Sequence, residues 1–231
     1  MTATQETGRR DLGILTGSLF VVLWMAGSVV QGASGAGFPR PDDDTATVAG
    51  YLREGASSME ASAGLQVLAA MALLWFGAVV AGALRRSGRP GPAPELAFAG
   101  AITAAVTLIV SAAVSIVYAS TDLVADDTMA QLSYQLTFWL GGPLHVAGLG
   151  LLIVAAAMGL GLPKWLGIAG LVIGALGLVA SLTPLVYQLV AFTPIGRFGG
   201  FLWLVVATVT LALRKGKPAE APAPAEESAR V

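Results

Sequence analysis

Long runs of apolar residues alternate with short polar segments along this chain. Each run contains about 20 residues or more, the length that an α-helix needs to cross a hydrocarbon core roughly 30 Å thick. The first five runs contain no charged residue, and the sixth contains only Arg197, whose long side chain can extend to the headgroups. The pattern predicts an all-α, polytopic transmembrane helix bundle with six spans, at residues 12–33, 63–84, 96–119, 134–160, 166–190 and 194–213.

The basic residues predict the orientation of these spans. Three of the 13 fall on one side of the membrane, namely Arg40, Arg53 and Arg197. The other ten fall on the opposite side: Arg9, Arg10, Arg85, Arg86, Arg89, Lys164, Arg214, Lys215, Lys217 and Arg230. The positive-inside rule therefore places both termini in the cytoplasm and the chain in the cell (inner) membrane.

The two ends of the chain differ from the bundle at residues 12–214. Residues 1–11 form a cytoplasmic N-terminal segment, and residues 215–231, rich in Pro, Glu and Ala, are expected to be a disordered cytoplasmic tail. Arg9 and Arg10 ahead of the first apolar run also imitate a cleavable signal peptide. The run of about 22 residues favours retention, because a signal core usually has 7 to 15. Cleavage of span one stays open as an alternative.

The first outer loop, at residues 34–62, should contain a short helix. Phe38-Pro39-Arg40-Pro41 is held extended by its two prolines. Asp44 or Thr45 can then cap an interfacial helix at about residues 45–54, which Gly55 can end. We expect this helix to lie flat over the outer ends of the bundle. A second helix, capped by Asp127, should run into span four.

Composition narrows the possible functions. The chain is 55% hydrophobic and 12% charged, whereas soluble domains carry roughly 25% charge. A net charge of −1 argues against a nucleic-acid partner, and zero cysteines remove disulfides, thiolate metal sites and iron–sulfur clusters. One histidine cannot supply two axial haem ligands, and no lysine lies within a span to hold retinal. We therefore expect no cofactor, no metal site and no catalytic residue.

Polar residues inside the spans are the remaining chemical evidence, and His145 is the foremost. It follows Gly141-Gly142-Pro143, where proline removes a backbone hydrogen bond, so a carbonyl near residue 139 needs another partner. Gly141 and Gly148 share a helical face with His145, which directs the imidazole into the bundle. His145 is interpreted as a neutral, packed side chain hydrogen-bonded across helices. Lining a ligand cavity, proton transfer and metal ligation remain alternatives.

Three glutamines extend the candidate site around His145. Pro184 should kink span five near its outer end, which would turn Gln188 towards the outer pocket of Gln31 and Gln66. The candidate ligand-binding residues are thus His145, Gln31, Gln66 and Gln188, and a structural role for the glutamines is the alternative.

Span five also carries a stripe of small residues at steps of three and four, at Gly167, Gly170, Gly174 and Gly177. Helices pack closely along such stripes. The contact could lie within the bundle, with a second copy of the chain or with another membrane protein. The lipid bilayer is the remaining expected partner.

Three motifs complete the sequence pattern. They are Phe38-Pro39-x-Pro41 followed by Val48-Ala49-x-Tyr51-Leu52, then Leu74-Trp75-Phe76-Gly77 ahead of Arg85-Arg86, and Leu162-Pro163-Lys164-Trp165-Leu166-Gly167. With them, most of residues 12–214 resembles uncharacterised six-span actinobacterial integral membrane proteins of the domain-of-unknown-function type. The resemblance implies a membrane bundle and no substrate.

The expected function is that of a non-enzymatic membrane component with a structural or regulatory role. The alternative is a transporter or sensor for a small, weakly polar or lipid-like molecule. In that case an outward-facing cavity beneath the 45–54 helix would be lined by His145 and the glutamines.

Overall fold

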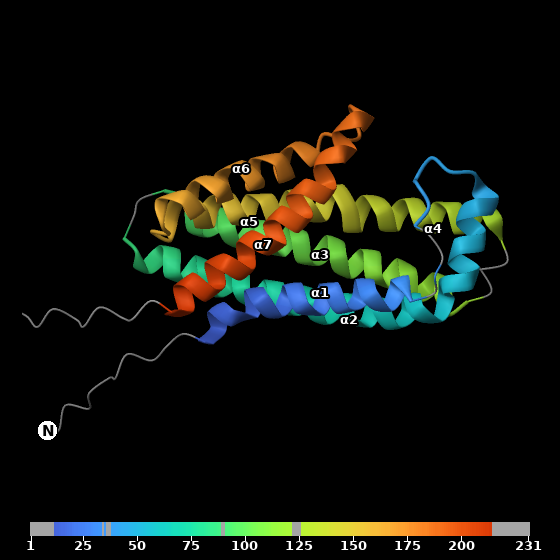
Figure 1. The fold of residues 1–231 in the computed structure, drawn as a ribbon, viewed down its shortest axis with the longest axis horizontal. Helices are drawn as coiled ribbons and strands as arrows, with labels where there is room; N and C mark the ends of the chain where they lie inside the picture. The colour runs from blue at the N-terminus through green and yellow to red at the C-terminus, as the bar shows by residue number, and fades with distance from the viewer. Residues whose placement is uncertain (1–11, 34, 36–37, 89–90, 122–125, 214–231) are drawn as a thin grey trace, which may run out of the picture.

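The structure is a computed structural model that describes residues 12–33, 35, 38–88, 91–121 and 126–213. Within these residues all regular structure is helical, which confirms the all-α fold (Figure 1). The predicted cytoplasmic segments 1–11 and 215–231 lie outside the described residues. The helices are α1 (Thr16–Gly32), α2 (Thr45–Arg86), α3 (Ala93–Ala119), α4 (Asp127–Trp139), α5 (His145–Gly159), α6 (Lys164–Ala180) and α7 (Phe192–Leu213).

Five helical stretches are long and apolar enough to cross a membrane. They comprise α1 with the 3₁₀ turn before it, α2, α3, α4 with α5, and α7 with the 3₁₀ turn Tyr187–Ala191 before it. The sixth apolar helix, α6, has 17 residues and is shorter. These lengths and compositions indicate a membrane protein.

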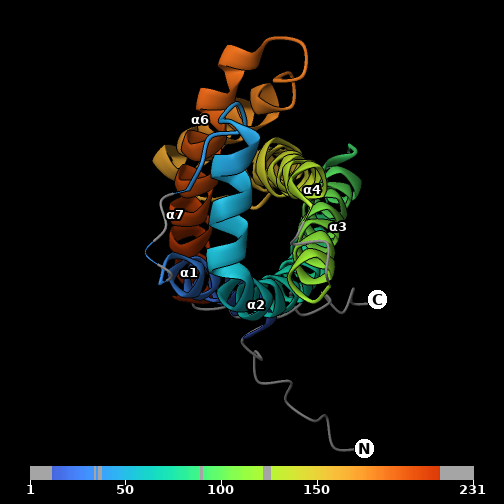
Figure 2. The same ribbon diagram turned by 90° about the vertical axis from the view of Figure 1, so that its right-hand side faces the viewer.

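The predicted break between the 45–54 helix and span two is wrong. One helix, α2, runs without interruption through 42 residues from Thr45 to Arg86. Gly55 lies inside it, because a glycine ends a helix by adopting positive φ and Gly55 does not. The next six residues include two alanines and a methionine, which favour continued helix. The first part of α2 nevertheless lies across one end of the bundle, as expected (Figure 2).

The helix starts depend on two aspartates. The Asp44 carboxylate accepts from the Thr47 amide at 2.9 Å and from its hydroxyl at 2.7 Å, which confirms Asp44 as the α2 cap. These bonds hold the pKa of the Asp44 carboxyl below its usual value, so the cap is fully charged at neutral pH and weakens only as pH falls through that lowered pKa. Asp126 caps α4, one residue before the predicted Asp127.

Helix α4 runs into α5 through a distorted segment, Leu140–Leu144, which we call the Pro143 break. Gly142 has φ −96° and ψ −108°, outside the helical region. The wide turn here confirms that Pro143 disrupts the fourth span without ending it. The break lies one residue before His145, at the start of α5.

The predicted span 166–190 ends about ten residues early. Helix α6 stops at Ala180, where Ser181 Oγ donates to Leu178 O at 2.7 Å and Thr183 Oγ1 to Ala180 O at 2.6 Å. These side chains take backbone acceptors that a longer helix would use, and Pro184 has no amide hydrogen to continue it. Pro184 therefore lies in a turn after the helix rather than at a kink within it.

Backbone contacts hold α5 between α3 and α6. A methyl group added at Gly148 would lie 2.5 Å from Ala104 N on α3, and one at Gly150 would lie 2.5 Å from Gly174 O on α6. Side chains cannot fit at such contacts, so the glycines allow the backbones to meet. Gly170, Gly174 and Gly177 all pack against α5 or α7 of the same chain. The stripe is thus an internal contact, which leaves these three glycines no surface for a partner.

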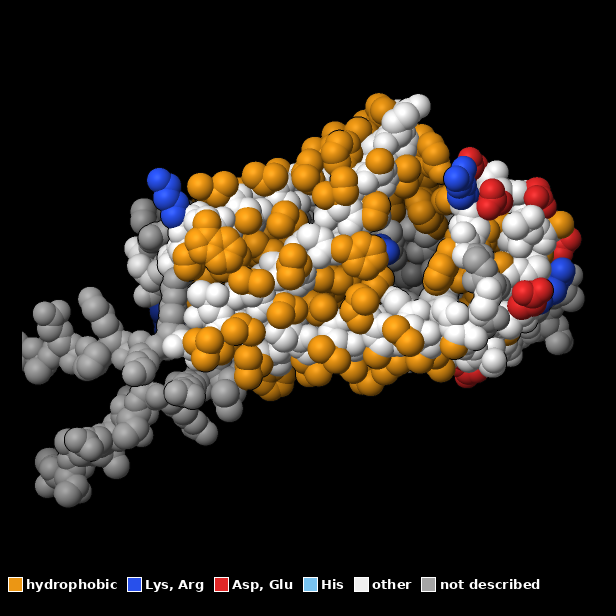
Figure 3. Space-filling view, in the orientation of Figure 1, with side chains coloured by type: hydrophobic (Ala, Val, Ile, Leu, Met, Phe, Trp, Pro, Cys, Tyr) orange, Lys and Arg blue, Asp and Glu red, His pale blue; other side chains and the backbone are white. Residues whose placement is uncertain are grey.

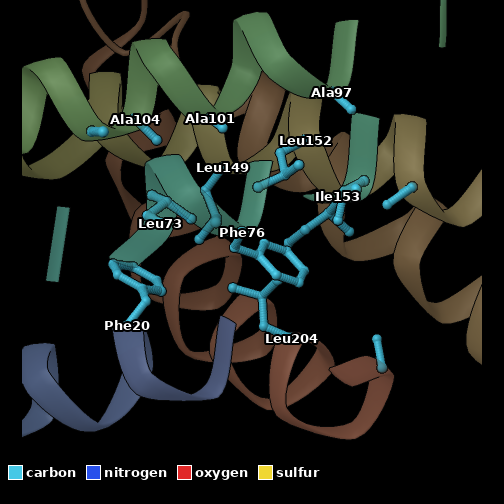
Figure 4. Close-up of a cluster of buried hydrophobic side chains, with 14 of the residues drawn as sticks. Phe20, Leu73, Phe76, Ala97, Ala101, Ala104, Leu149, Leu152, Ile153 and Leu204 are labelled. Carbon is cyan, nitrogen blue, oxygen red and sulfur yellow. The ribbon is translucent and has the colours of Figure 1, made fainter. Parts of the chain in front are cut away.

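Larger side chains fill the space around this contact (Figure 4). Phe20 from α1, Phe76 from α2, Leu149 and Ile153 from α5 and Leu204 from α7 are each at most 1% exposed. Small residues on α3, namely Ala97, Ala101 and Ala104, border the same core. Close approach of α5 to α3 and α6 is therefore accompanied by bulky packing on a further face of α5.

Two glycines of the stripe on α6 should respond differently to alanine. A methyl group at Gly174 would lie 2.7 Å from Val154 Cγ2 and 2.8 Å from Gly150 O, whereas one at Gly167 has its nearest neighbour at 3.7 Å. Gly174→Ala should lower the free energy of unfolding in detergent by about 1–3 kcal/mol because the core is overpacked. Gly167→Ala should raise it by up to about 1 kcal/mol through helix propensity. Equal effects would show that Gly174 does not lie at a close contact.

Candidate functional site

A small cavity, lined mainly by apolar atoms, lies beneath the first part of α2, where the sequence predicted an outward-facing pocket. Its walls come from α1, α2, α3 and α4: Gln31, Tyr51, Leu52, Met59, Ser115, Tyr118, Ser133, Tyr134 and Thr137. The volume is about 30 Å³. One buried water needs roughly 10–15 Å³ on this scale, so the cavity holds about two waters and no larger organic molecule.

A second hydrophobic cluster closes this cavity. Val48, Tyr51 and Leu52 from α2 pack on Tyr118 from α3 and Ala130 from α4. The proline tract is fastened to α4 beside them, because Tyr134 Oη donates to Pro39 O and Gln135 Nε2 donates to Pro41 O. The extended segment 38–41 therefore acts as a strap between the start of α2 and α4.

The four candidate residues do not converge. Gln31 lines the cavity and donates from Nε2 to Tyr51 Oη at 3.0 Å. Gln66 donates to Ser62 Oγ on its own helix at 3.4 Å. Gln188 is exposed in the turn before α7, because α6 ends too early to carry it into the bundle. His145 does not line the cavity either.

His145 lies in the centre of the bundle. It is fully buried, and its Nδ1 lies 2.9 Å from Ala104 O on α3. Its ring centre lies 6.0 Å from that of Phe20 on α1. The hydrogen bond between α5 and α3 matches the interpretation of a packed imidazole that joins two helices. Its Nε2 is buried and has no hydrogen-bond partner among the described residues.

Arg197 is the residue that sequence reasoning missed. The sequence predicted that its side chain extends to the headgroups, and this is wrong. Its guanidinium instead donates from Nη2 to Gly141 O at the Pro143 break. It also stacks over Trp24 on α1, with Cζ 5.1 Å from the ring centre. Arg197 thus supplies a hydrogen-bond partner at the Pro143 break, for the carbonyl of Gly141 rather than that of residue 139, which the sequence singled out. The signal was present: a single charge within a span is rarely left in contact with lipid.

The described residues contain no group of three or more His, Cys, Asp or Glu side chains that could hold a metal ion. Comparisons with family models, curated proteins and solved structures find no match for this chain. The resemblance to six-span actinobacterial membrane proteins therefore stays a prediction.

Two substitutions of His145 separate packing from polar function. His145→Leu fills most of the same volume and removes one hydrogen bond, and Ala104 O keeps the Thr107 hydroxyl as a partner at 3.1 Å. It should cost no more than about 1.5 kcal/mol of unfolding free energy. His145→Ala leaves a cavity beside Phe20 and should cost about 2–4 kcal/mol. A leucine variant as unstable as the alanine variant, in detergent unfolding, would contradict the packing interpretation.

Proposed function

We propose that this chain is an integral protein of the cell membrane with six spans and both termini in the cytoplasm, and that it serves as a non-enzymatic structural or regulatory component. The observation that carries the membrane proposal is the surface. On the face shown in Figure 3, apolar side chains cover the middle of the molecule, and charged side chains, apart from one basic group beside a hollow, gather at its two ends. A soluble protein rarely exposes so continuous an apolar surface.

Large apolar side chains point outwards from several helices. Val22 on α1 is 62% exposed, Trp75 on α2 is 64% exposed and Leu202 on α7 is 67% exposed. The core meanwhile contains Ala and Gly at helix contacts, as is usual where lipid surrounds a bundle. Exposure of the bulky residues to acyl chains accounts for this distribution.

The helix arrangement supports six spans and a common side for the termini. Helix α6, with 17 residues, is roughly 26 Å long, at the short end of the range for a spanning helix. The start of α1 and the end of α7 lie at the same end of the bundle (Figure 1). Arg85 and Arg86 end α2, and Lys164 starts α6, at that end too. The positive-inside rule makes this end cytoplasmic.

The other end extends beyond the proposed membrane. Twenty residues counted back along α5 and α4 from Gly159 reach about residue 140, so the 13 residues of α4 project roughly 20 Å further. Arg53 on α2 pairs with Asp127 on α4 in this extension. The extension is therefore built as a small folded cap with its own core rather than as a loose loop.

A structural or regulatory role is supported by the packing. The helices meet at backbone contacts, and the cavity beneath α2 has room for about two waters. The transporter or sensor alternative is favoured by the position of that cavity, which lies where an outward-facing site was predicted and contains Gln31. The cavity is too small for an organic ligand, so we place the transporter or sensor role second.

The topology can be tested with single cysteines, because the chain has none of its own. Cysteines at Ser57 and Thr128, both exposed in the cap, should react with a membrane-impermeant maleimide in intact cells. Cysteines at Ser87 and Lys164, exposed at the opposite end, should react only after the cells are permeabilised. Labelling at Ser87 in intact cells would contradict the orientation.

A further inference from the structure

Two side chains from α7 lie beside Gly142 in the Pro143 break. A methyl group placed on Gly142 would have Arg197 Nη2 and Thr193 Cγ2 as its nearest atoms, each at 4.0 Å. Thr193 and Arg197 are four residues apart, so they share one face of α7. A methyl group on Gly142 would therefore fit beside both side chains.

These two side chains have few hydrogen-bond partners among the described residues. A guanidinium has five N–H donors, and the structure shows one of them used, to Gly141 O. Arg197 Nε is buried and has no hydrogen-bond partner among the described residues. The same holds for the hydroxyl of Thr193, a residue that is 6% exposed. The ion pairs among the described residues join Arg53 to Asp127 and Arg85 to Glu95, so no described carboxylate neutralises Arg197. Arg197 is partly buried, and a charge held in apolar surroundings without a counterion is costly.

We propose that this site binds an oxyanion, the phosphate or carboxylate of a membrane amphiphile. The free edge of the Arg197 guanidinium would make parallel hydrogen bonds to two oxygens, and the Thr193 hydroxyl would donate to one of them. The inference rests on the membrane location proposed above. The structural role proposed above does not itself imply a ligand, and the present inference adds one of a stated chemical class.

The depth of the site favours a lipid as the source of the oxyanion. Arg197 lies 16 residues before the end of α7 at Leu213, roughly 24 Å along the helix, close to the far boundary of a hydrocarbon core about 30 Å thick. Ile195 and Phe198 beside it are 50% and 52% exposed. Figure 3 shows a hollow between apolar side chains, with a basic side chain at its edge. A phospholipid could place its phosphate there and its chains along α7.

The test is ligand-dependent thermal stability of the full chain purified in an uncharged detergent. Dioleoyl-phosphatidylglycerol carries an anionic phosphate, and dioleoyl-phosphatidylcholine at the same mole fraction controls for acyl chains. Phosphatidylglycerol should raise the melting temperature more than phosphatidylcholine, because only a ligand with affinity for the folded state stabilises it. Inorganic phosphate without lipid forms the third arm.

Three variants assign the effect to the site. Arg197→Gln should abolish the difference between the two lipids. Thr193→Val leaves the bond between Arg197 and Gly141 in place and should weaken phosphatidylglycerol binding about tenfold, through one lost hydrogen bond to a charged group. Arg85→Gln, at the opposite end of the bundle, should respond as the parent does. If Arg197→Gln fails to fold, Thr193→Val and Arg197→Lys carry the test, and both should weaken the response.

Equal stabilisation by both lipids, or an unchanged response in Thr193→Val and the folded Arg197 variants, would overturn the proposal. An Arg197-dependent shift with inorganic phosphate that equals the phosphatidylglycerol shift would support the site and make its ligand a soluble oxyanion. Recovery of the chain in the soluble fraction, without detergent, would instead contradict the membrane location itself. A chain that needs detergent and ignores phosphatidylglycerol contradicts the oxyanion site alone.

Discussion

The close approach of α3, α5 and α6 is the constraint on which the rest of this structure depends. In lipid, helices gain little from burying apolar side chains, because acyl chains solvate those side chains equally well. Association then relies on van der Waals contact, which is greatest where backbones touch. Gly148 lets α5 meet α3, and Gly150, two residues later, lets it meet α6. Because both contacts lie on α5, this helix fixes the positions of its neighbours.

A second constraint follows from the Pro143 break in the same span. Proline removes a backbone donor, and a carbonyl exposed in an apolar interior must find another partner. Arg197 meets this need from α7, and its contact with Trp24 brings α1 to the same point. The charge that repairs the helix is itself left without a described counterion. The absence of a described counterion for Arg197 is the reason to propose an oxyanion ligand at the break.

Local chemistry explains which features could be predicted from the sequence. The Asp44 cap, the apolar runs and the disruption at Pro143 depend on residues close together in the chain, and the sequence predicted all three. The end of α6 was predicted too late, because the apolar run continues past Ala180. The hydroxyls of Ser181 and Thr183 bind backbone carbonyls there and end the helix within that run. Gly55 was expected to end a helix that its neighbours continue.

The candidate site was predicted less well, because it depends on contacts between distant segments. Gln31 reaches the cavity through Tyr51, 20 residues later, but Gln188 cannot do so once α6 ends at Ala180. Arg197 and Gly141 are 56 residues apart, and no local pattern relates them. The sequence shows that Arg197 is unusual and that a carbonyl near residue 139 needs a partner. Only the fold brings Arg197 to the same break, where it binds the carbonyl of Gly141.

Coupling between glycine substitutions tests the central role of α5 most directly. Gly100→Ala and Gly148→Ala act at one crossing of α3 and α5. Once the first substitution has separated the helices, the second should lower the unfolding free energy by less than it does alone. The difference should be at least about 0.5 kcal/mol, the order of coupling energies between residues in contact. Gly100→Ala and Gly174→Ala act on opposite sides of α5, and their costs should add. The measurement is the unfolding free energy of the single and double variants in one detergent. Additive costs for the first pair, or negligible costs for Gly148→Ala, would contradict this account.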